Sequence, residues 1–405
     1  MQLIRGGSGR DLRVDFFRGL ALWWIFIDHT HGDLLGFYTL HEFAPCDAAE
    51  IFVLLAGFGA AKAYAGAMDR HGWRYGATDA VGRAWTLYIA HIFLFVTYAA
   101  QVSWFAAALH RPQDVTAIQL DPLQQSPFHA LLQALTLRYQ PSMLNILPLY
   151  IVLLLIFAIA MPVLRRPRLL LGLSVAMYLV AWAGQFNLPG WRGTGWYLDP
   201  FSWQLVFVVG AILGYAPPQL PRQPALLDVL AVVAIAWGVV VMIVMPPYEH
   251  QVPWLHSLVP MLQGSDKTTE APARVVSMFA FLWLAIRLVP PEAPWLRSRA
   301  AALLELPGQH SLPVFCASIL LAFVCSIGLR ANSGAEMELA VNICGALCLL
   351  AVAGIAAWAG QPGRAQRPLR NTRDRVSATA PQTAGLQRAA TPSLASGHNS
   401  LKAAR

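Results

Sequence analysis

The stretch RGLALWWIFIDHTHGD, residues 18–33, decides how the fold of this chain is interpreted. Its middle is apolar enough for the hydrocarbon core of a membrane, yet it begins with Arg18 and ends in a polar cluster that includes Asp28 and His29. Ionisable side chains inside a membrane segment are costly, and they therefore indicate function. Arg18 and His29 are eleven positions apart, which on an α-helix places both on one face, roughly 16 Å apart along the axis.

The composition of the whole chain agrees with a membrane protein. Of its 405 residues, 57% are hydrophobic and 12% are charged, whereas soluble domains carry about 25% charged residues. Apolar runs of about 20 residues, the length that crosses a bilayer, alternate with short charged segments. We therefore expect an all-α polytopic integral membrane protein with about ten transmembrane helices. The expected spans are residues 16–35, 47–67, 84–108, 143–163, 169–186, 200–215, 225–245, 274–289, 312–329 and 338–359.

The positive charges in the short loops set the expected orientation. With the N-terminus inside, the cytoplasmic segments hold fourteen Lys or Arg residues before the C-terminal tail, and the outer loops hold six. This bias favours a cytoplasmic location for both termini. The expected organisation is a cytoplasmic N-terminal segment (1–15), a ten-helix membrane domain (16–360) and a basic cytoplasmic tail (361–405).

The tail accounts for most of the net charge of +8, because residues 361–405 carry eight Lys or Arg and one acid. Its content of Ala, Ser, Thr, Pro and Gln predicts disorder. A basic segment next to the membrane is expected to meet anionic lipid rather than nucleic acid. The five cysteines form no CxxC pair, so they predict small buried hydrophobes and neither a disulfide nor a metal site.

His29 is the first candidate for catalysis. An imidazole near its own pKa is a natural general base for a hydroxyl nucleophile, although a histidine at this depth could also simply hydrogen-bond another helix. Asp28 is a second candidate, but it lies about 100° away from His29 on the helix and cannot face it directly. Glu50 falls at about the height of His29 on the next, antiparallel helix, where it could orient the imidazole. Asp47 and Glu50 also have the spacing of a plain capping box.

A group of cations is expected near the inner face. It could form a mouth for a phosphorylated donor such as coenzyme A, or it could merely obey the positive-inside rule, as Arg18 itself could. Its members are Arg13, Arg18, Lys62, Arg74 and Arg83. Gly57 and Gly59 on the second span should allow a close approach of helices.

Further polar and aromatic residues are compatible with either a functional or a structural role. His91 on the third span and Asn145 near the outer end of the fourth are additional site candidates, although a lone buried histidine is more often structural. Pro148 is expected to kink the fourth span. The outer loops are rich in aromatic rings such as Trp191 and Tyr197, which could stack on sugars or simply favour the membrane interface.

These residues also carry a resemblance to known proteins. Arg18, ten residues and His29 resemble the R-x10-H motif of the acyltransferase-3 superfamily of membrane proteins, and EIFVLLAGF (50–58) is similar to its second span. Six blocks in order resemble the OpgC family of succinyltransferases for osmoregulated periplasmic glucans, over about residues 10–330. They are RDLRVDFFRGLALWWIFIDH, DAAEIFVLLAGFGAAKAY, RAWTLYIAHIF, LNILPLYIVLLL, WYLDPFSWQLVFVVGAILG and GQHSLPVFCASILLAF.

The resemblance implies a fold and an activity. It implies ten spans with both ends cytoplasmic, in the bacterial inner membrane, and acyl transfer from cytoplasmic acyl-CoA to a periplasmic hydroxyl. His29 would be the catalytic histidine, with Arg18 as its motif partner. Glu50 and His91 match family blocks. Asn145 stands where an acidic residue often occurs in the family, which is a departure.

We therefore expect an O-acyltransferase, most simply one that moves a succinyl group from acyl-CoA, as co-substrate, to a periplasmic glucan or related polysaccharide. Glu50 or Asp28 would support His29, and the cations would hold the donor; no permanently bound cofactor is expected. Three alternatives remain open. They are an O-acetyltransferase of another surface glycan, a transporter or flippase that uses Asp28 and His29 as a proton relay, and an inactive scaffold in a glucan-assembly complex.

Overall fold

The computed structural model describes residues 11–217, 224–244 and 266–360. Within these ranges the ordered elements are helical, apart from one isolated bridge between Pro189 and Gly195. The expected basic tail, 361–405, lies outside the described residues. The longer helices are α1 (Leu12–His29), α3 (Ala48–Ala60), α4 (Gly66–His71), α5 (Trp73–Ala108), α8 (Pro127–Leu135), α9 (Ile146–Ala160), α10 (Pro167–Gly184), α11 (Pro200–Tyr215), α12 (Pro224–Val239), α14 (Pro272–Leu288), α15 (Arg299–Gln309), α16 (Ser311–Ala331) and α17 (Ala335–Ala359).

Short elements connect these helices. The π-helix η2 continues α3 into α4, and η3 and η5 extend α9 and α12. The short elements are η1 (Leu34–Tyr38), α2 (Leu40–Phe43), η2 (Ala61–Ala65), α6 (Gln113–Ala117), α7 (Asp121–Gln125), η3 (Met161–Arg165), η4 (Trp191–Gly193), η5 (Val240–Val244) and η7 (Pro294–Arg297).

Each expected span coincides with a helix in the described part of the chain. Seven of these helical segments are long and apolar enough to cross a membrane. The other three are α1, which carries four charged residues, α11 with 16 residues and α14 with 17. The chain is therefore an all-helical, multi-pass type of membrane protein, whereas the count of ten crossings and the cytoplasmic location of both termini stay predictions.

Several helix boundaries differ from the expected spans for identifiable reasons. The first helix ends at His29 rather than at residue 35, because Thr30 turns out of the helix and Gly32 adopts a positive φ of 94°. Pro148 does not kink α9. It lies in the first turn of that helix, where the backbone N–H groups have no helical partner to lose.

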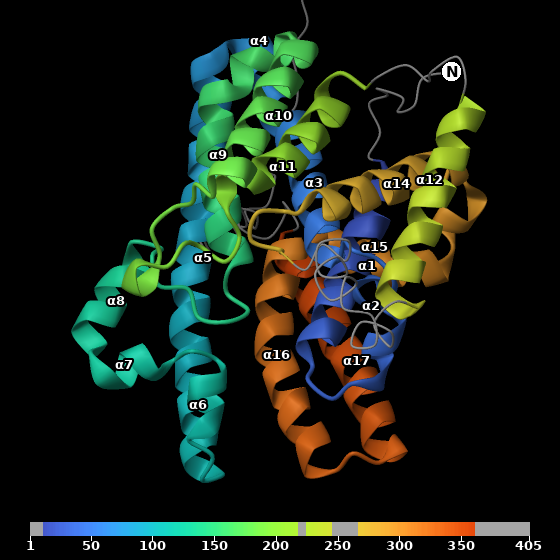
Figure 1. The fold of residues 1–405 in the computed structure, drawn as a ribbon. Helices are drawn as coiled ribbons and strands as arrows, with labels where there is room; N and C mark the ends of the chain where they lie inside the picture. The colour runs from blue at the N-terminus through green and yellow to red at the C-terminus, as the bar shows by residue number, and fades with distance from the viewer. Residues whose placement is uncertain (1–10, 218–223, 245–265, 361–405) are drawn as a thin grey trace, which may run out of the picture. The chain divides into compact units, whose positions relative to one another are not determined.

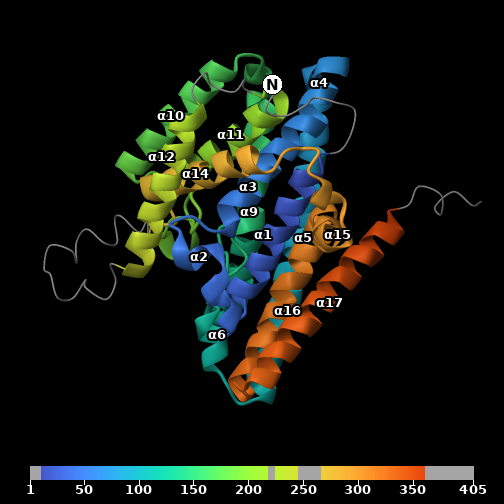
Figure 2. The same cartoon turned by 90° about the vertical axis from the view of Figure 1, so that its right-hand side faces the viewer.

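Helix α1 lies among α3, α15 and α16, as Figures 1 and 2 show. Its contact with α15 requires glycine on both sides, because a Cβ on Gly19 would overlap the carbonyl oxygen of Leu304, and a Cβ on Gly308 that of Asp15. Gly57 of α3 has the same relation to Phe207 of α11. The expected close approach at Gly57 is therefore confirmed. These contacts fix α1 and α3, which carry half of the candidate site residues, His29 and Glu50 among them.

The α3–α11 crossing yields a stability prediction. Gly57→Ala should lower the melting temperature in detergent, because the added methyl group must separate two backbones; overpacking of this kind typically costs about 1–3 kcal/mol. Gly82→Ala on α5 is the matched control, since nothing lies within 4 Å of a Cβ there. Equal melting temperatures for the two variants, measured by thermal unfolding, would contradict this packing.

Candidate functional site

His29 is the last residue of α1, and its ring is fixed by the backbone of its own helix. Nδ1 lies 2.5 Å from the carbonyl oxygen of Ile25, one turn earlier. Because a carbonyl oxygen can only accept, Nδ1 carries a proton in this contact, and the neutral ring has its lone pair on Nε2. The imidazole is thus held in the tautomer that a general base requires.

His29 faces a cavity of about 380 Å³, which we call the reaction cavity. Its wall combines apolar side chains from α1, α3, α9 and α16 with polar ones from the connecting segments. Asn145, a predicted site residue, lines it together with His29. The polar lining residues are His29, Gln119, Gln140, Ser142, Asn145, Tyr197 and Lys267.

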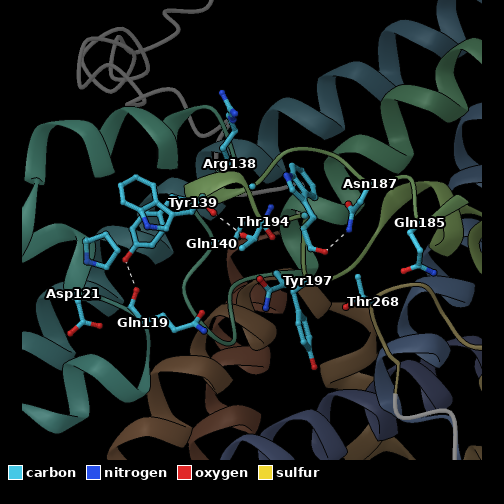
Figure 3. A pocket seen from close by; sticks show the side chains of 16 residues that line it. Gln119, Asp121, Arg138, Tyr139, Gln140, Gln185, Asn187, Thr194, Tyr197 and Thr268 are labelled. Carbon is cyan, nitrogen blue, oxygen red and sulfur yellow. Dashed lines mark hydrogen bonds between the residues drawn. The ribbon is translucent and has the colours of Figure 1, made fainter. Parts of the chain in front are cut away.

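The reaction cavity continues into a larger cleft of about 710 Å³, shown in Figure 3. Gln119, Gln140, Asn145 and Tyr197 line both spaces. A further hollow of about 400 Å³ adjoins the cleft at Arg138, Gly190 and Trp191. We call the second and third spaces together the polar cleft. The arrangement can hold an extended ligand with one end at His29.

Aromatic rings and amides make up much of the polar cleft. Trp191 packs against Tyr139, with ring centroids 5.2 Å apart, and against His129 at 5.3 Å. Two hydrogen bonds fix the wall (Figure 3): the Tyr139 hydroxyl donates to the carbonyl of Gln119, and Asn187 donates to that of Trp196. Flat rings with adjacent amides suit sugar rings, whose faces are apolar and whose edges carry hydroxyls.

A buried network of charges lies behind the reaction cavity. Arg274 of α14 contacts Glu50 and, at 3.0 Å, Asp47; its Nε is 3.5 Å from Glu270. Lys267 lies 2.5 Å from the Asp47 carboxylate. The expected capping box of α3 is also present, since Glu50 accepts a hydrogen bond from the backbone N–H of Asp47 at 3.0 Å.

Two groups of this network lie outside the helices, and their pKa values follow from their surroundings. Burial, and next the neighbouring carboxylate of Glu50, raise the pKa of Glu270 well above its ordinary value, which favours the neutral acid. Burial alone would lower the pKa of Lys267, but the carboxylates of Asp47 and Glu50 outweigh it and raise that pKa. Lys267 therefore stays an ammonium beside the reaction cavity.

The segment from Asp266 to Glu270, which contains Lys267, is held in place by hydrogen bonds to its backbone. The carbonyl of Lys267 accepts from the indole of Trp203 at 2.9 Å, and that of Thr268 accepts from the backbone N–H of Asp199 at 3.0 Å. Glu270 adopts a positive φ of 52°, a conformation that costs free energy and persists only when its surroundings enforce it.

The predicted partners of His29 have other contacts. Glu50 was expected to orient the imidazole, but its bonds go to Arg274 and to the Asp47 backbone, and Ile25 provides the orienting group instead. Asp28 accepts a hydrogen bond from the Thr39 hydroxyl at 2.6 Å. Neither carboxylate lines the reaction cavity. A catalytic role for them stays a prediction.

The Arg18 side chain lies between α1 and α3. It donates to the carbonyl of Leu55 at 3.0 Å, and a Cβ on Gly59 would lie 3.2 Å from its guanidinium. Arg18 is absent from the lining of the reaction cavity, as its position about three turns before His29 on α1 requires. Arg13 is buried and paired with Asp11 at 2.7 Å, so it does not present its charge at an open mouth.

The remaining candidates lie outside the reaction cavity. Lys62 is exposed within the π-helix η2, 5.8 Å from the ring centre of Phe58. Arg74 is exposed and Arg83 is half-buried, so both remain candidates for donor binding. His91 is fully buried in α5, and neither ring nitrogen has a hydrogen-bond partner. No group of three metal-ligating side chains occurs among the residues that the structure describes.

Sequence reasoning missed Arg274, Lys267 and most of the polar cleft. In the sequence, Arg274 and Lys267 contribute only to the number of positive charges in the outer loops. An arginine in the first turn of an apolar helix could nevertheless have indicated a buried ion pair. No local pattern marks the cleft residues, since they come from three separated segments, 119–145, 185–197 and 268.

Comparison with known protein families places the chain. The model of the family described as OpgC protein matches residues 10–361, which includes the reaction cavity, the polar cleft and the charge network. No curated protein and no solved structure matches the chain.

The charge network yields a prediction with a control on the same helix. Arg274→Met should lower the melting temperature strongly, because it leaves the buried carboxylate of Glu50 without the cation that contacts it, a loss that typically costs about 3–5 kcal/mol. Arg287→Met removes an arginine from the other end of α14, where it pairs with Asp228 at 3.0 Å and about a third of its side chain is exposed. Its effect should be much smaller. Similar shifts for both variants in thermal unfolding would contradict the assigned role of Arg274.

Proposed function

Because this chain belongs to the OpgC family, we propose that it moves a succinyl group from succinyl-CoA to a hydroxyl of a periplasmic glucan. The family implies a membrane acyltransferase in general. The observation that carries the proposal is the position of His29, with its Nε2 lone pair available, in a small cavity that continues into a larger polar cleft. This arrangement lets a polymer lie in the cleft and present one hydroxyl to the base.

The proposed reaction has His29 as the general base. Nε2 takes the proton of the acceptor hydroxyl while that oxygen attacks the thioester carbonyl. The new C–O ester bond forms, the C–S bond breaks, and the imidazolium returns its proton to the departing thiolate of coenzyme A. The Ile25 carbonyl keeps Nδ1 as the proton-bearing nitrogen throughout. Catalysis thus needs no covalent enzyme intermediate.

Asn145 is proposed to assist this step. It lines both the reaction cavity and the polar cleft. Although Asn145 is the N-cap residue of α9, its side chain makes no capping hydrogen bond to that helix. An amide N–H can donate to the thioester oxygen as negative charge develops there. The departure from an acidic residue at this position is consistent with such a role, because a carboxylate would repel the developing charge.

The donor is proposed to reach the reaction cavity from the side of Arg18. The helical geometry of α1 separates Arg18 from His29 by roughly 16 Å along the axis, a distance that the pantetheine arm of coenzyme A can bridge. Lys62, Arg74 and Arg83 would add attraction for the phosphates. This route goes with cytoplasmic termini and a location in the bacterial inner membrane, both of which remain part of the proposal.

Substitution of His29 tests the reaction directly. His29→Ala and His29→Gln should lower the rate of acyl transfer about 10²- to 10⁴-fold, as expected for loss of a general base. His31→Ala is the control, because His31 is exposed and bonds through its backbone N–H to Ser326. The rate is measured with purified protein in detergent, which removes any ion gradient.

A folded His29→Ala protein that transfers the acyl group at the wild-type rate would contradict the proposed mechanism. Loss of transfer in the wild type on removal of the membrane gradient would instead support a transporter. Transfer from labelled acetyl-CoA is compared with transfer from labelled succinyl-CoA. A preference for the acetyl donor would favour the acetyltransferase alternative over a succinyltransferase.

The polar cleft gives a prediction about the acceptor. Trp191→Ala should raise the KM for the glucan about 2- to 10-fold and leave kcat nearly unchanged, since an aromatic contact of this kind contributes about 0.5–1.5 kcal/mol. Trp237→Ala, an exposed tryptophan on α12 outside the cleft lining, is the control. An unchanged KM for Trp191→Ala, measured by steady-state kinetics, would show that the acceptor does not bind there.

A further inference from the structure

Lys267 is the one Lys, Arg, Asp or Glu among the described residues that line the reaction cavity. Around it the wall is apolar or carries neutral amides and hydroxyls, apart from His29 itself. An ammonium on such a wall attracts an anion in the cavity, because the wall carries no carboxylate to compete with the anion and water is partly excluded.

Within the charge network, Lys267 is the member that borders the reaction cavity. The Lys267 side chain is 24% exposed, whereas those of Asp47 and Arg274 are 8% and 6% exposed. Glu50 and Glu270 are fully buried behind them. A ligand in the reaction cavity therefore meets the ammonium and not the carboxylates.

The network leaves Lys267 able to bind a second anion. Asp47 contacts both Lys267 and Arg274, so its charge is shared between two cations. An ammonium has three N–H donors, and the contact with Asp47 uses one. The backbone of Lys267 is fixed by Trp203, which limits the entropy lost when a ligand is bound.

We propose that Lys267 is the residue that selects the donor, by binding the free carboxylate of a dicarboxylic acyl group in the reaction cavity while the thioester carbon lies next to His29. This inference rests on the proposed function and deepens it. No bond forms or breaks at Lys267. It gives the charged acyl group an advantage over an uncharged acyl group of the same length.

A competing role for Lys267 would be stabilisation of the oxyanion that forms at the thioester carbon. That oxyanion arises with every acyl donor, so a residue serving it would affect all donors alike. A carboxylate-binding residue affects only donors with a second charge. The two roles therefore differ in the ratio between donors rather than in the absolute rate.

The test compares succinyl-CoA with butyryl-CoA, which has the same chain length and a methyl group in place of the carboxylate. Purified wild type should show a kcat/KM for succinyl-CoA about 10- to 100-fold above that for butyryl-CoA, the range expected for a hydrogen bond between charged groups. Lys267→Met should lose this preference and keep butyryl transfer. Lys267→Arg keeps the charge and should retain most of the preference.

The matched control is Arg168→Met, which removes an exposed cation at the start of α10 and should leave the donor ratio unchanged. Melting temperatures of all variants are recorded beside the kinetics. Equal loss with both donors in Lys267→Met would assign Lys267 to the oxyanion and overturn the inference. Equal use of the two donors by the wild type would overturn it without any variant.

The outcomes also separate this inference from the function on which it rests. If both acyl groups are transferred without preference, the proposed acyltransferase activity is supported and only the role of Lys267 in donor selection is contradicted. Transfer from neither donor, with a folded protein and glucan present, removes the proposed function and the inference together.

Discussion

The contact of Arg274 with Asp47 and Glu50 is the interaction on which the site depends. Two carboxylates at the start of α3 could not be buried together without a cation, because desolvation and mutual repulsion would drive them apart. Arg274 reaches them from the first turn of α14 and so joins α3 to α14. The segment that precedes α14 is thereby brought to the wall of the reaction cavity, where it places Lys267.

Much of the fold could be predicted, because the signals for it are local. Every expected span holds a helix, since about 20 apolar residues can satisfy their backbone in lipid only as a helix. The capping box at Asp47 and the close approach at Gly57 are also readable from a few neighbouring residues. His29 was found for the same reason: a histidine at the end of an apolar run is conspicuous. Boundaries were less predictable, because Thr30 and Gly32 end α1 through backbone geometry.

The rest of the site could not be predicted, because its contacts join distant parts of the chain. Glu50 and Arg274 are 224 positions apart, and nothing near either residue indicates the other. Glu50 was therefore assigned to His29 on helix height alone, whereas the stronger electrostatic partner lay on α14. The polar cleft has the same origin: Tyr139 and Trp191 are each ordinary loop aromatics, and only the fold brings their rings into contact.

The position of His29 at the end of α1 has a consequence for the proposed chemistry. The last carbonyl groups of a helix carry partial negative charge, which stabilises a cation there. An imidazolium formed when His29 accepts a proton would gain from this, while the ammonium of Lys267, on the wall of the same cavity, would oppose it. A donor carboxylate bound to Lys267 would cancel much of that opposition. Binding of a dicarboxylic donor would then not only position the thioester but also make His29 a better base, so that selection of the donor and activation of the acceptor would share one electrostatic cause.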